Sequence, residues 1–482
     1  MLVKKILISC AAAICVALMA SGAAPKREFR GAWLHTVYQS QYKNMGTEKC
    51  KQYLRSQLDS LHSMGVNAVI FQVRPQSDAF YASELEPWSR FLTDNGKAPS
   101  PYWDPLQFMV EESHARGMEL HAWLNPYRVT SSAKQTLPKN HIYHKHPERF
   151  VRYDGKLYFN PALKENREFI CKVVEDIVSR YDVDAIHFDD YFYPYPVAGK
   201  NFPDAAQYAK SGKKLSLGDW RRKNVDMLIE ELNTTIKKLK PWVRFGISPF
   251  GIWRNKKSDA RGSDTNGLEN YDSLYADVLL WEEKGWIDYL MPQLYWELDH
   301  KSASYRVLVD WWNNNAGKNR HLFIGQDVER TMKKNELATK IASTRNLSNI
   351  AGNCWWPGYS LTRNSGSVAD SLSINHQKTI AIPPACPWLG ETAPAAPGDI
   401  AVELDKTIVW TAGIPEGKTG DAVRFAVYRF ESPEDIDIKS AEALKCVTPD
   451  MFYKPTEAGV YVITALDRIN NESEPSVPVM IK

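Results

Sequence analysis

Residues 184–194 read Asp-Ala-Ile-His-Phe-Asp-Asp-Tyr-Phe-Tyr-Pro, an apolar strand that ends in two carboxylates and three aromatic rings before a proline. Alternate side chains of a strand share a face, so Ile186 and Phe188 lie on one face and His187 and Asp189 on the other. This pattern is typical of one strand of a catalytic barrel, with the apolar face against a helix and the acids at the C-terminal mouth. An aspartate pair that caps a following turn is the alternative. The rings after the acids favour a carbohydrate site.

Strand-like apolar runs alternate with amphipathic helical segments through most of the chain. The eight predicted strands are 30–37, 67–75, 119–128, 184–194, 243–251, 289–297, 321–328 and 352–358. Because alternation of strand and helix implies a parallel sheet, eight such units predict an α/β fold, a (β/α)8 TIM barrel over residues 27–380. An open doubly wound sheet is the competing fold, but no glycine-rich phosphate loop follows the first strand.

The composition changes after the barrel. Five prolines between Ile382 and Pro397 predict a stiff linker over residues 381–397. Short strand-like runs then predict a small all-β sandwich over residues 398–482. This module resembles a fibronectin type III domain, most clearly in residues 459–467, Gly-Val-Tyr-Val-Ile-Thr-Ala-Leu-Asp. The resemblance implies a spacing or binding role for the module.

Residues 1–24 have the features of a secretory signal peptide. Lys4 and Lys5 precede an apolar run that begins at Ile6, and small residues follow to Ala24. We therefore expect an exported protein, periplasmic or at the cell surface, and soluble rather than lipid-anchored. No later segment is long and apolar enough to span a bilayer. A net charge of +3 without a basic run gives no support to nucleic-acid binding, and the oligomeric state stays open.

Polar and aromatic side chains collect near the C-terminal ends of the predicted strands. Since parallel strands of a barrel all end on the same face, these side chains are expected to converge on one pocket. The competing interpretation is that the rings pack in the core and that the strand histidines are buried and hydrogen-bonded. The candidates for substrate binding are Trp33, His35, Arg74, His121, Trp123, Asn125, Arg128, His187, Tyr191, Tyr193, Gln293, Tyr295 and Trp355.

Two long loops, residues 130–164 and 195–217, are predicted to wall this pocket. The first loop carries His141, His144 and His146, which invite interpretation as a metal cluster. With no ligating acid placed beside them, a solvated loop is favoured, and neither a metal nor a cofactor is predicted. A metal-dependent deacetylase lacks its ligand set for the same reason.

Six motifs resemble, in chain order, those of the glycosyl hydrolase-like 10 family of bacterial envelope and secreted proteins. They are Arg-Gly-Ala-Trp-Leu (30–34), Phe-Gln-Val-Arg-Pro (71–75), Trp-Leu-Asn-Pro-Tyr-Arg (123–128), His-Phe-Asp-Asp-Tyr-Phe-Tyr-Pro (187–194), Gly-Ile-Ser-Pro-Phe-Gly (246–251) and Met-Pro-Gln-Leu-Tyr-Trp (291–296). The resemblance implies a barrel that hydrolyses glycosidic bonds. It also implies glycan strands of peptidoglycan as substrate, including strands stripped of peptide.

Glycoside hydrolysis uses two carboxyl groups, one to protonate the leaving oxygen and one as nucleophile or base. Asp189 is predicted to point into the pocket as nucleophile or base, with Asp190 in a supporting role. Glu297, at the end of the sixth strand, is the candidate acid, and Asp327 is the reserve.

Two further acids, Asp184 and Asp288, open their strands and are therefore assigned to the opposite, structural end of the barrel. The rival class is a barrel that binds glycan without cutting it, with the C-terminal module as a spacer or second binding unit. An intact pair of acids favours the enzyme.

Overall fold

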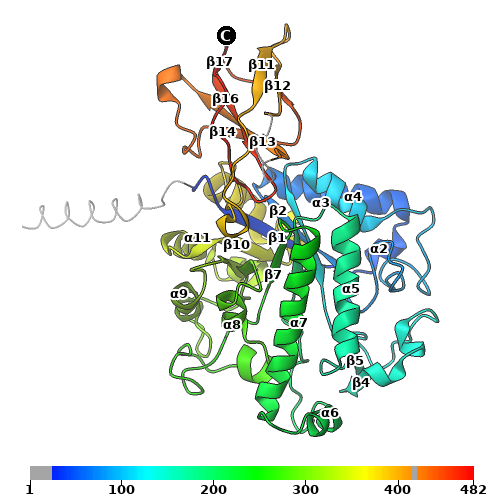
Figure 1. The fold of residues 1–482 in the computed structure, drawn as a ribbon. Helices are drawn as coiled ribbons and strands as arrows, with labels where there is room; N and C mark the ends of the chain where they lie inside the picture. Colours follow the sequence, from blue (N-terminus) through cyan, green and yellow to red (C-terminus); the bar gives the residue numbers. More distant parts are fainter. Residues whose placement is uncertain (1–23, 414–420) are drawn as a thin grey trace, which may run out of the picture.

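A computed structural model describes residues 24–413 and 421–482, and its larger part is a closed barrel of eight parallel strands (Figure 1). Around the barrel the strand order is β1-β10-β9-β8-β7-β6-β3-β2. The barrel strands are β1 Phe29–Leu34, β2 Ala68–Arg74, β3 Glu119–Leu124, β6 Ala185–Phe188, β7 Arg244–Ile247, β8 Tyr289–Leu290, β9 His321–Asp327 and β10 Ile350–Trp356. The predicted (β/α)8 barrel is therefore confirmed, and all eight predicted strands are present.

Several strands end earlier than predicted. Strand β8 stops at Leu290, and Pro292 follows shortly after it. Proline has no backbone N–H to donate to a ladder, so the regular pairing ends there. Gln293 nevertheless forms isolated bridges to Phe250 and Gly325, which continue the sheet toward its mouth. These irregular ends carry the residues of the pocket described below.

Helices surround the barrel, and their starts are encoded locally. Asp104 caps α4 by accepting hydrogen bonds from the N–H groups of Leu106 and Gln107, and Pro105 occupies the first turn. The α-helices are α2 Gln41–Asn44, α3 Thr47–Ser63, α4 Pro105–His114, α5 Lys164–Arg180, α6 Ala205–Lys210, α7 Leu217–Leu239, α8 Val278–Glu283, α9 Tyr305–Asn315, α10 Val328–Lys333, α11 Leu337–Asn346, α12 Gly358–Thr362 and α13 Val368–Ser371.

The barrel has two apolar core layers, one outside the strands and one inside them. The outer layer lies between strands and helices, and the inner layer fills the barrel with side chains such as Phe29, Tyr289 and Phe323. Gly246 on β7 makes room for the Tyr289 ring, because a Cβ at this position would lie 1.9 Å from the ring carbon Cζ. The interior is therefore a packed core, and the cavity described below lies at the mouth.

The long loop after β3 contains a hairpin that the sequence analysis missed, formed by β4 Phe150–Tyr153 and β5 Lys156–Phe159. Its turn is the pair Asp154-Gly155, and both residues have positive φ. This is the turn chemistry of a two-residue β-hairpin, so the signal was present in the sequence.

The C-terminal residues form two antiparallel sheets, as predicted for a small all-β sandwich. One sheet has the order β11-β12-β15 and the other β14-β13-β16-β17. The strands are β11 Gly398–Val402, β12 Ile408–Thr411, β13 Arg424–Phe430, β14 Leu444–Thr448, β15 Phe452–Tyr453, β16 Gly459–Leu466 and β17 Val479–Ile481. The resemblance to a fibronectin type III domain stays a prediction.

The sandwich sits on the N-terminal end of the barrel, opposite the end that carries the β4–β5 hairpin and α6 (Figure 1). Asn470 of the sandwich donates a 2.9 Å hydrogen bond to the buried carboxylate of Glu119, at the start of β3. The proline-rich segment packs into this junction, since Ile382 lies in a sandwich core and Asn67 donates to the Ala381 carbonyl. The sandwich thus closes the structural end of the barrel.

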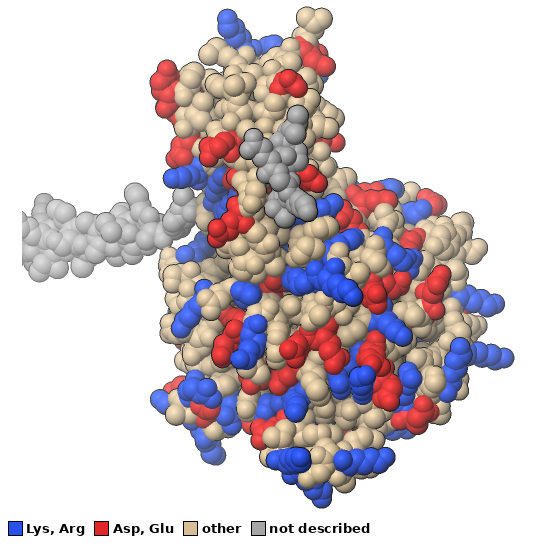
Figure 2. Space-filling model, in the orientation of Figure 1, with Lys and Arg blue, Asp and Glu red and all other residues tan. Residues whose placement is uncertain are grey.

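The expected signal peptide lies almost entirely outside the described residues. Across residues 24–413 and 421–482, no helix combines the length and apolar character that a membrane span requires. Lys and Arg alternate with Asp and Glu over the face of the barrel in view (Figure 2), in keeping with the small net charge.

Candidate active site

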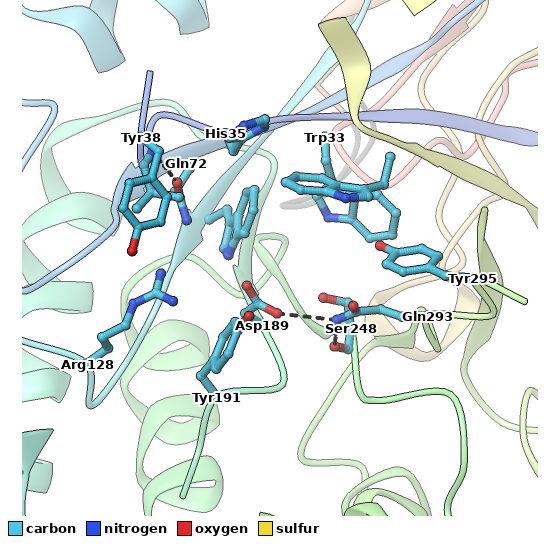
Figure 3. Close-up of a pocket in the computed structure, with 13 residues that line it drawn as sticks. Trp33, His35, Tyr38, Gln72, Arg128, Asp189, Tyr191, Ser248, Gln293 and Tyr295 are labelled. Atoms are coloured by element: carbon cyan, nitrogen blue, oxygen red, sulfur yellow. Dashed lines mark hydrogen bonds between the residues drawn. The ribbon is translucent and has the colours of Figure 1, made fainter. Parts of the chain in front are cut away.

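A cavity of about 340 Å³ opens at the C-terminal mouth of the barrel. Tyr38 and Arg128 stand on one side, Trp33 and Tyr295 on the other, and Asp189 lies between them (Figure 3). The lining residues are Trp33, His35, Val37, Tyr38, Gln72, Trp123, Arg128, Asp189, Tyr191, Ser248, Gln293, Tyr295 and Trp356. They come from seven of the eight strands or the segments that follow them, which is how a barrel assembles one site from distant parts of the chain.

Asp189 is the one carboxylate among these lining residues of the described chain. It follows β6 directly and is only 7% exposed. Its Oδ1 accepts hydrogen bonds from the backbone N–H of Asp190 at 2.8 Å and from the Gln293 amide at 3.3 Å. Burial raises the pKa of Asp189 above its ordinary value, against these hydrogen bonds and the nearby charge of Arg128.

Asp190 is buried behind Asp189 and does not line the cavity. Its carboxylate accepts a hydrogen bond from the hydroxyl of Tyr195. Burial, and then the negative charge of Asp189, hold the pKa of Asp190 well above its usual range. Two adjacent buried carboxyl groups of this kind titrate as a unit, and their raised pKa favours retention of one proton.

Arg128 and Tyr191 form one wall of the cavity. The Arg128 guanidinium lies 4.7 Å from the centre of the Tyr191 ring and donates two hydrogen bonds to the Pro75 carbonyl. This arrangement fixes a cation beside Asp189 and an aromatic face that is suited to a sugar ring.

The floor of the cavity rests on a chain of hydrogen bonds inside the barrel. Trp33 Nε1 donates to His187 Nε2 at 3.2 Å, and His187 Nδ1 lies 3.0 Å from the hydroxyl of Tyr289. The same hydroxyl lies 2.9 Å from His121 Nδ1, whose opposite nitrogen bonds to Glu119. Burial lowers the pKa of both histidines, which are neutral structural groups beneath the site and do not line it.

Three residues present buried polar atoms without a partner in the described part of the chain. Gln72 uses its Oε1 to accept from the N–H groups of Thr36 and Val37, which leaves its Nε2 unpaired. Trp123 Nε1 and His35 Nδ1 are also unpaired, and all three residues line the cavity. Buried donors are rarely left unsatisfied, so the pocket is prepared for a ligand rich in oxygen.

Eight of the residues predicted from the sequence meet in this cavity. They are Trp33, His35, Trp123, Arg128, Asp189, Tyr191, Gln293 and Tyr295. The structure places the other candidates elsewhere. Arg74 is fully buried in an ion pair with Glu86 at 2.5 Å, and Asn125 donates to the Pro75 carbonyl. Tyr193 packs against the Phe202 ring.

Trp355 does not line the cavity as predicted, because its side chain points to the outer face of β10. Trp355 is 0% exposed and belongs to the outer layer, whereas its neighbour Trp356 lines the cavity. Gly352 has φ +148 and the pairing register between β9 and β10 shifts at this point, which a strict period of two does not anticipate. Sequence reasoning also missed Val37, Tyr38, Gln72 and Ser248.

Glu297, the predicted acid, does not line the cavity. Its carboxylate lies 3.1 Å from the ammonium group of Lys334 and is partly exposed. Alternation brings Gln293 and Tyr295 into the cavity, but the chain bends at Trp296, so Glu297 does not continue on their face. The reserve acid, Asp327, accepts a hydrogen bond from the N–H of Arg330 and caps α10.

The three loop histidines are not gathered around a metal position. His141 is buried and its Nδ1 accepts from the N–H of Tyr143, while Nε2 bonds to Ser77. His146 pairs with Glu148 on the surface. In the described ranges no three His, Cys, Asp or Glu side chains are grouped as metal ligands.

Comparison with known proteins places the chain among glycosidases. The sequence profile described as "Glycosyl hydrolase-like 10" matches residues 28–341. The Glycosyl hydrolase YngK of Bacillus subtilis is 40% identical over 475 residues, which cover 93% of this chain and 92% of the relative. The Glycosyl hydrolase DigH of Escherichia coli K12 is 39% identical over 320 residues, covering 61% and 72%. The glycoside hydrolase domain of PgaB from Bordetella bronchiseptica superposes with a TM-score of 0.49 at 12% identity, over 72% of this chain and 98% of that domain.

Proposed function

Because the chain belongs to the glycosyl hydrolase-like 10 family and is a glycosidase, we propose that it cleaves the glycan strands of the bacterial cell wall. Strands stripped of peptide are the favoured form of this substrate, as the resemblance of the six sequence motifs implies. The signal-like N-terminus supports export to the compartment that holds such strands.

The observation that carries this proposal is a buried carboxyl group at the base of an aromatic, donor-rich pocket. Asp189 lies between the rings of Tyr191 and Tyr295, and Gln72 Nε2 and Trp123 Nε1 offer unpaired hydrogen bonds. Rings stack on the apolar faces of a sugar, and free donors bind its hydroxyl or acetyl oxygens.

Asp189 and Asp190 then serve as the acid. Asp189 donates a proton to the glycosidic oxygen as the bond from that oxygen to C1 breaks, and the burial that raises its pKa favours the protonated form that this step requires. The leaving sugar departs with the proton as a new hydroxyl group. In the second half of the reaction, Asp189 takes a proton from the water that attacks C1.

The second role in the reaction is that of the nucleophile that attacks C1, and here a group of the substrate takes this role. With Glu297 paired to Lys334, no second carboxylate of the described chain lines the cavity. Cell-wall sugars carry a 2-acetamido group, and in substrate-assisted glycosidases the oxygen of this group attacks C1 in place of an enzyme nucleophile. The cyclic intermediate is opened by water with overall retention of configuration.

Release of reducing ends from purified, peptide-free glycan strands tests the proposal. We expect release by the wild-type chain, and loss of release when the same strands are chemically N-deacetylated. Strands that bind but yield no reducing ends would overturn the proposal and identify a glycan-binding barrel. Equal cleavage of acetylated and deacetylated strands would refute the role of the acetamido group.

A further inference from the structure

A second cavity, of about 380 Å³, lies between the loops that follow β2 and β3. Residues 76–78 and 87–96 form one side, and residues 134–138 with His141 form the other. Both loops start at the mouth of the barrel, so this second cavity opens near the site that holds Asp189. None of the residues assigned to the reaction belongs to it.

The floor of the second cavity is built from buried polar groups. Ser77 is fully buried with φ +55, a left-handed conformation that is costly for a serine. It donates to Glu86 at 2.7 Å and bonds to His141 Nε2 at 3.2 Å. Since Glu86 is also paired with Arg74, the strained loop is held rigidly from below.

One atom of this floor points to a ligand. Gln76 is 1% exposed and lines the cavity. Its Oε1 accepts from Arg90 Nε at 3.2 Å, but its Nε2 has no partner among the described residues. A buried amide donor left open in this way requires an acceptor from outside the chain.

The charges around the second cavity favour an anion. Arg90 and Lys134 line it, and neither forms an ion pair with a described carboxylate. Lys43 and Asp94 neutralise one another. The remaining acid, Asp78, accepts hydrogen bonds from two backbone N–H groups and from Ser89, and burial raises its pKa to about 6. The net charge facing the cavity is therefore positive.

An aromatic ring joins the two cavities. Tyr38 lines the first cavity, is 65% exposed and has φ +61. Its ring meets the edge of Phe91, which lines the second cavity, at a centroid distance of 5.9 Å. The strained backbone of Tyr38 holds its ring in solvent between two polar cavities. In this position the ring can stack on a sugar unit that passes from one cavity to the other.

We propose that the second cavity is a subsite for a sugar unit that carries a carboxylate, on the same glycan chain whose scissile bond lies at Asp189. The chain would cross the Tyr38 ring, with the carboxylate against Arg90 and Lys134 and an oxygen on Gln76 Nε2. This inference rests on the proposed function. The subsite requires a carboxylate on a sugar unit of the bound chain. Cell-wall glycan provides one, because every second sugar of a peptide-free strand bears a lactyl carboxylate.

The test compares peptide-free glycan strands with the same strands after reduction of their carboxylates to alcohols. Binding is measured by calorimetry with the full chain carrying Asp189→Asn, so that turnover does not interfere. Adding Arg90→Gln or Lys134→Gln should weaken binding of the carboxylated strands about tenfold and leave binding of the reduced strands unchanged. Lys139→Gln, which removes the same charge from an exposed position on the same loop outside the cavity, is the matched control.

Equal losses for both kinds of strand, or no loss with either variant, would overturn the subsite. Lys134 is exposed, so its substitution reports on binding even where Arg90→Gln disturbs folding. The readout is binding and not cleavage. Wild-type chain that binds carboxylated strands selectively but releases no reducing ends would therefore refute the proposed function and leave the subsite standing.

Discussion

The backbone N–H of Asp190 donates a 2.8 Å hydrogen bond to Oδ1 of Asp189, so the two neighbouring acids at the end of β6 share one buried environment. Only Asp189 reaches the cavity, while Asp190 turns to the hydroxyl of Tyr195. One member of the pair is therefore placed to meet a substrate, and the other is buried behind it.

Asp189→Asn should lower kcat by several orders of magnitude, because an amide cannot donate and recover the proton of the leaving oxygen. The fold should survive, since asparagine keeps the size of the side chain and the acceptor for the Asp190 N–H. Reducing-end assays and a thermal melt measure the two effects. Near-normal turnover would exclude Asp189 as the acid and make Asp190 the first residue to test.

Activity should fall as the pH rises through the raised pKa of the Asp189–Asp190 pair. The pair must carry a proton to act as an acid, and burial keeps that proton bound above the ordinary carboxyl range. A pH profile of kcat/KM measures the alkaline limb. A rate that instead rises through this limb would show that the pair works only as an ionised base or nucleophile.

The raised pKa of Asp190 predicts that Asp190→Asn stabilises the folded chain at neutral pH. The folded pKa of Asp190 lies above its unfolded value, so folding must take up a proton once the pH exceeds about 4, the ordinary pKa of aspartate. The amide removes that cost. Thermal midpoints should therefore favour the variant at pH 7 and coincide with those of the wild type below about pH 4; a lower midpoint at pH 7 would contradict the shift.

Much of the fold was predictable because the sequence shows the two-residue period of the strands and the 3.6-residue period of the helices. Apolar faces such as Ile186 and Phe188 repeat every second residue, and the helices between strands repeat their own pattern. Trp33 and Trp123 lie near the ends of the regular strands β1 and β3, Asp189 follows β6 directly, and all three line the cavity.

Three of the candidates that lie elsewhere, Glu297, Trp355 and Arg74, come from positions where local regularity ends. Glu297 follows a bend at Trp296, and Trp355 follows a register shift, so alternation no longer reports which way these side chains face. Arg74 ends β2 after a register shift in the pairing with β3, and its partner Glu86 is supplied by a loop that has no periodic signal. Tyr38 lies in a turn after β1 that has no periodic signal, whereas Gln72 belongs to strand β2 and was overlooked as a lining residue.

Adjacent tryptophans on β10 allow a matched experiment. Trp356→Ala should weaken oligosaccharide binding with little effect on stability, because Trp356 lines the cavity and remains partly exposed. Trp355→Ala should instead cost about 3–5 kcal/mol of unfolding free energy, since the ring is fully buried in the outer layer. Ligand quenching of tryptophan fluorescence and denaturant titration separate the two; equal effects in both assays would contradict the assigned faces.

The junction between barrel and sandwich gives the last prediction. Glu119 is fully buried, lies 2.8 Å from the guanidinium of Arg244, and accepts hydrogen bonds from His121 and Asn470. Glu119→Ala leaves Arg244 buried without its counter-charge and should cost about 3–5 kcal/mol. Asn470→Ala removes one hydrogen bond to that carboxylate and should cost about 1–3 kcal/mol.

Both costs should appear in a single unfolding transition, because the sandwich and the barrel share this buried network. The folded Asn470→Ala chain should keep its kcat, since the cavity lies at the opposite end of the barrel. Equilibrium denaturation followed by tryptophan fluorescence, with reducing-end release at a temperature well below the midpoint, measures stability and activity separately. Two resolved transitions in the wild-type chain, or an Asn470→Ala variant as stable as the wild type, would show that the sandwich is attached to the barrel without stabilising it.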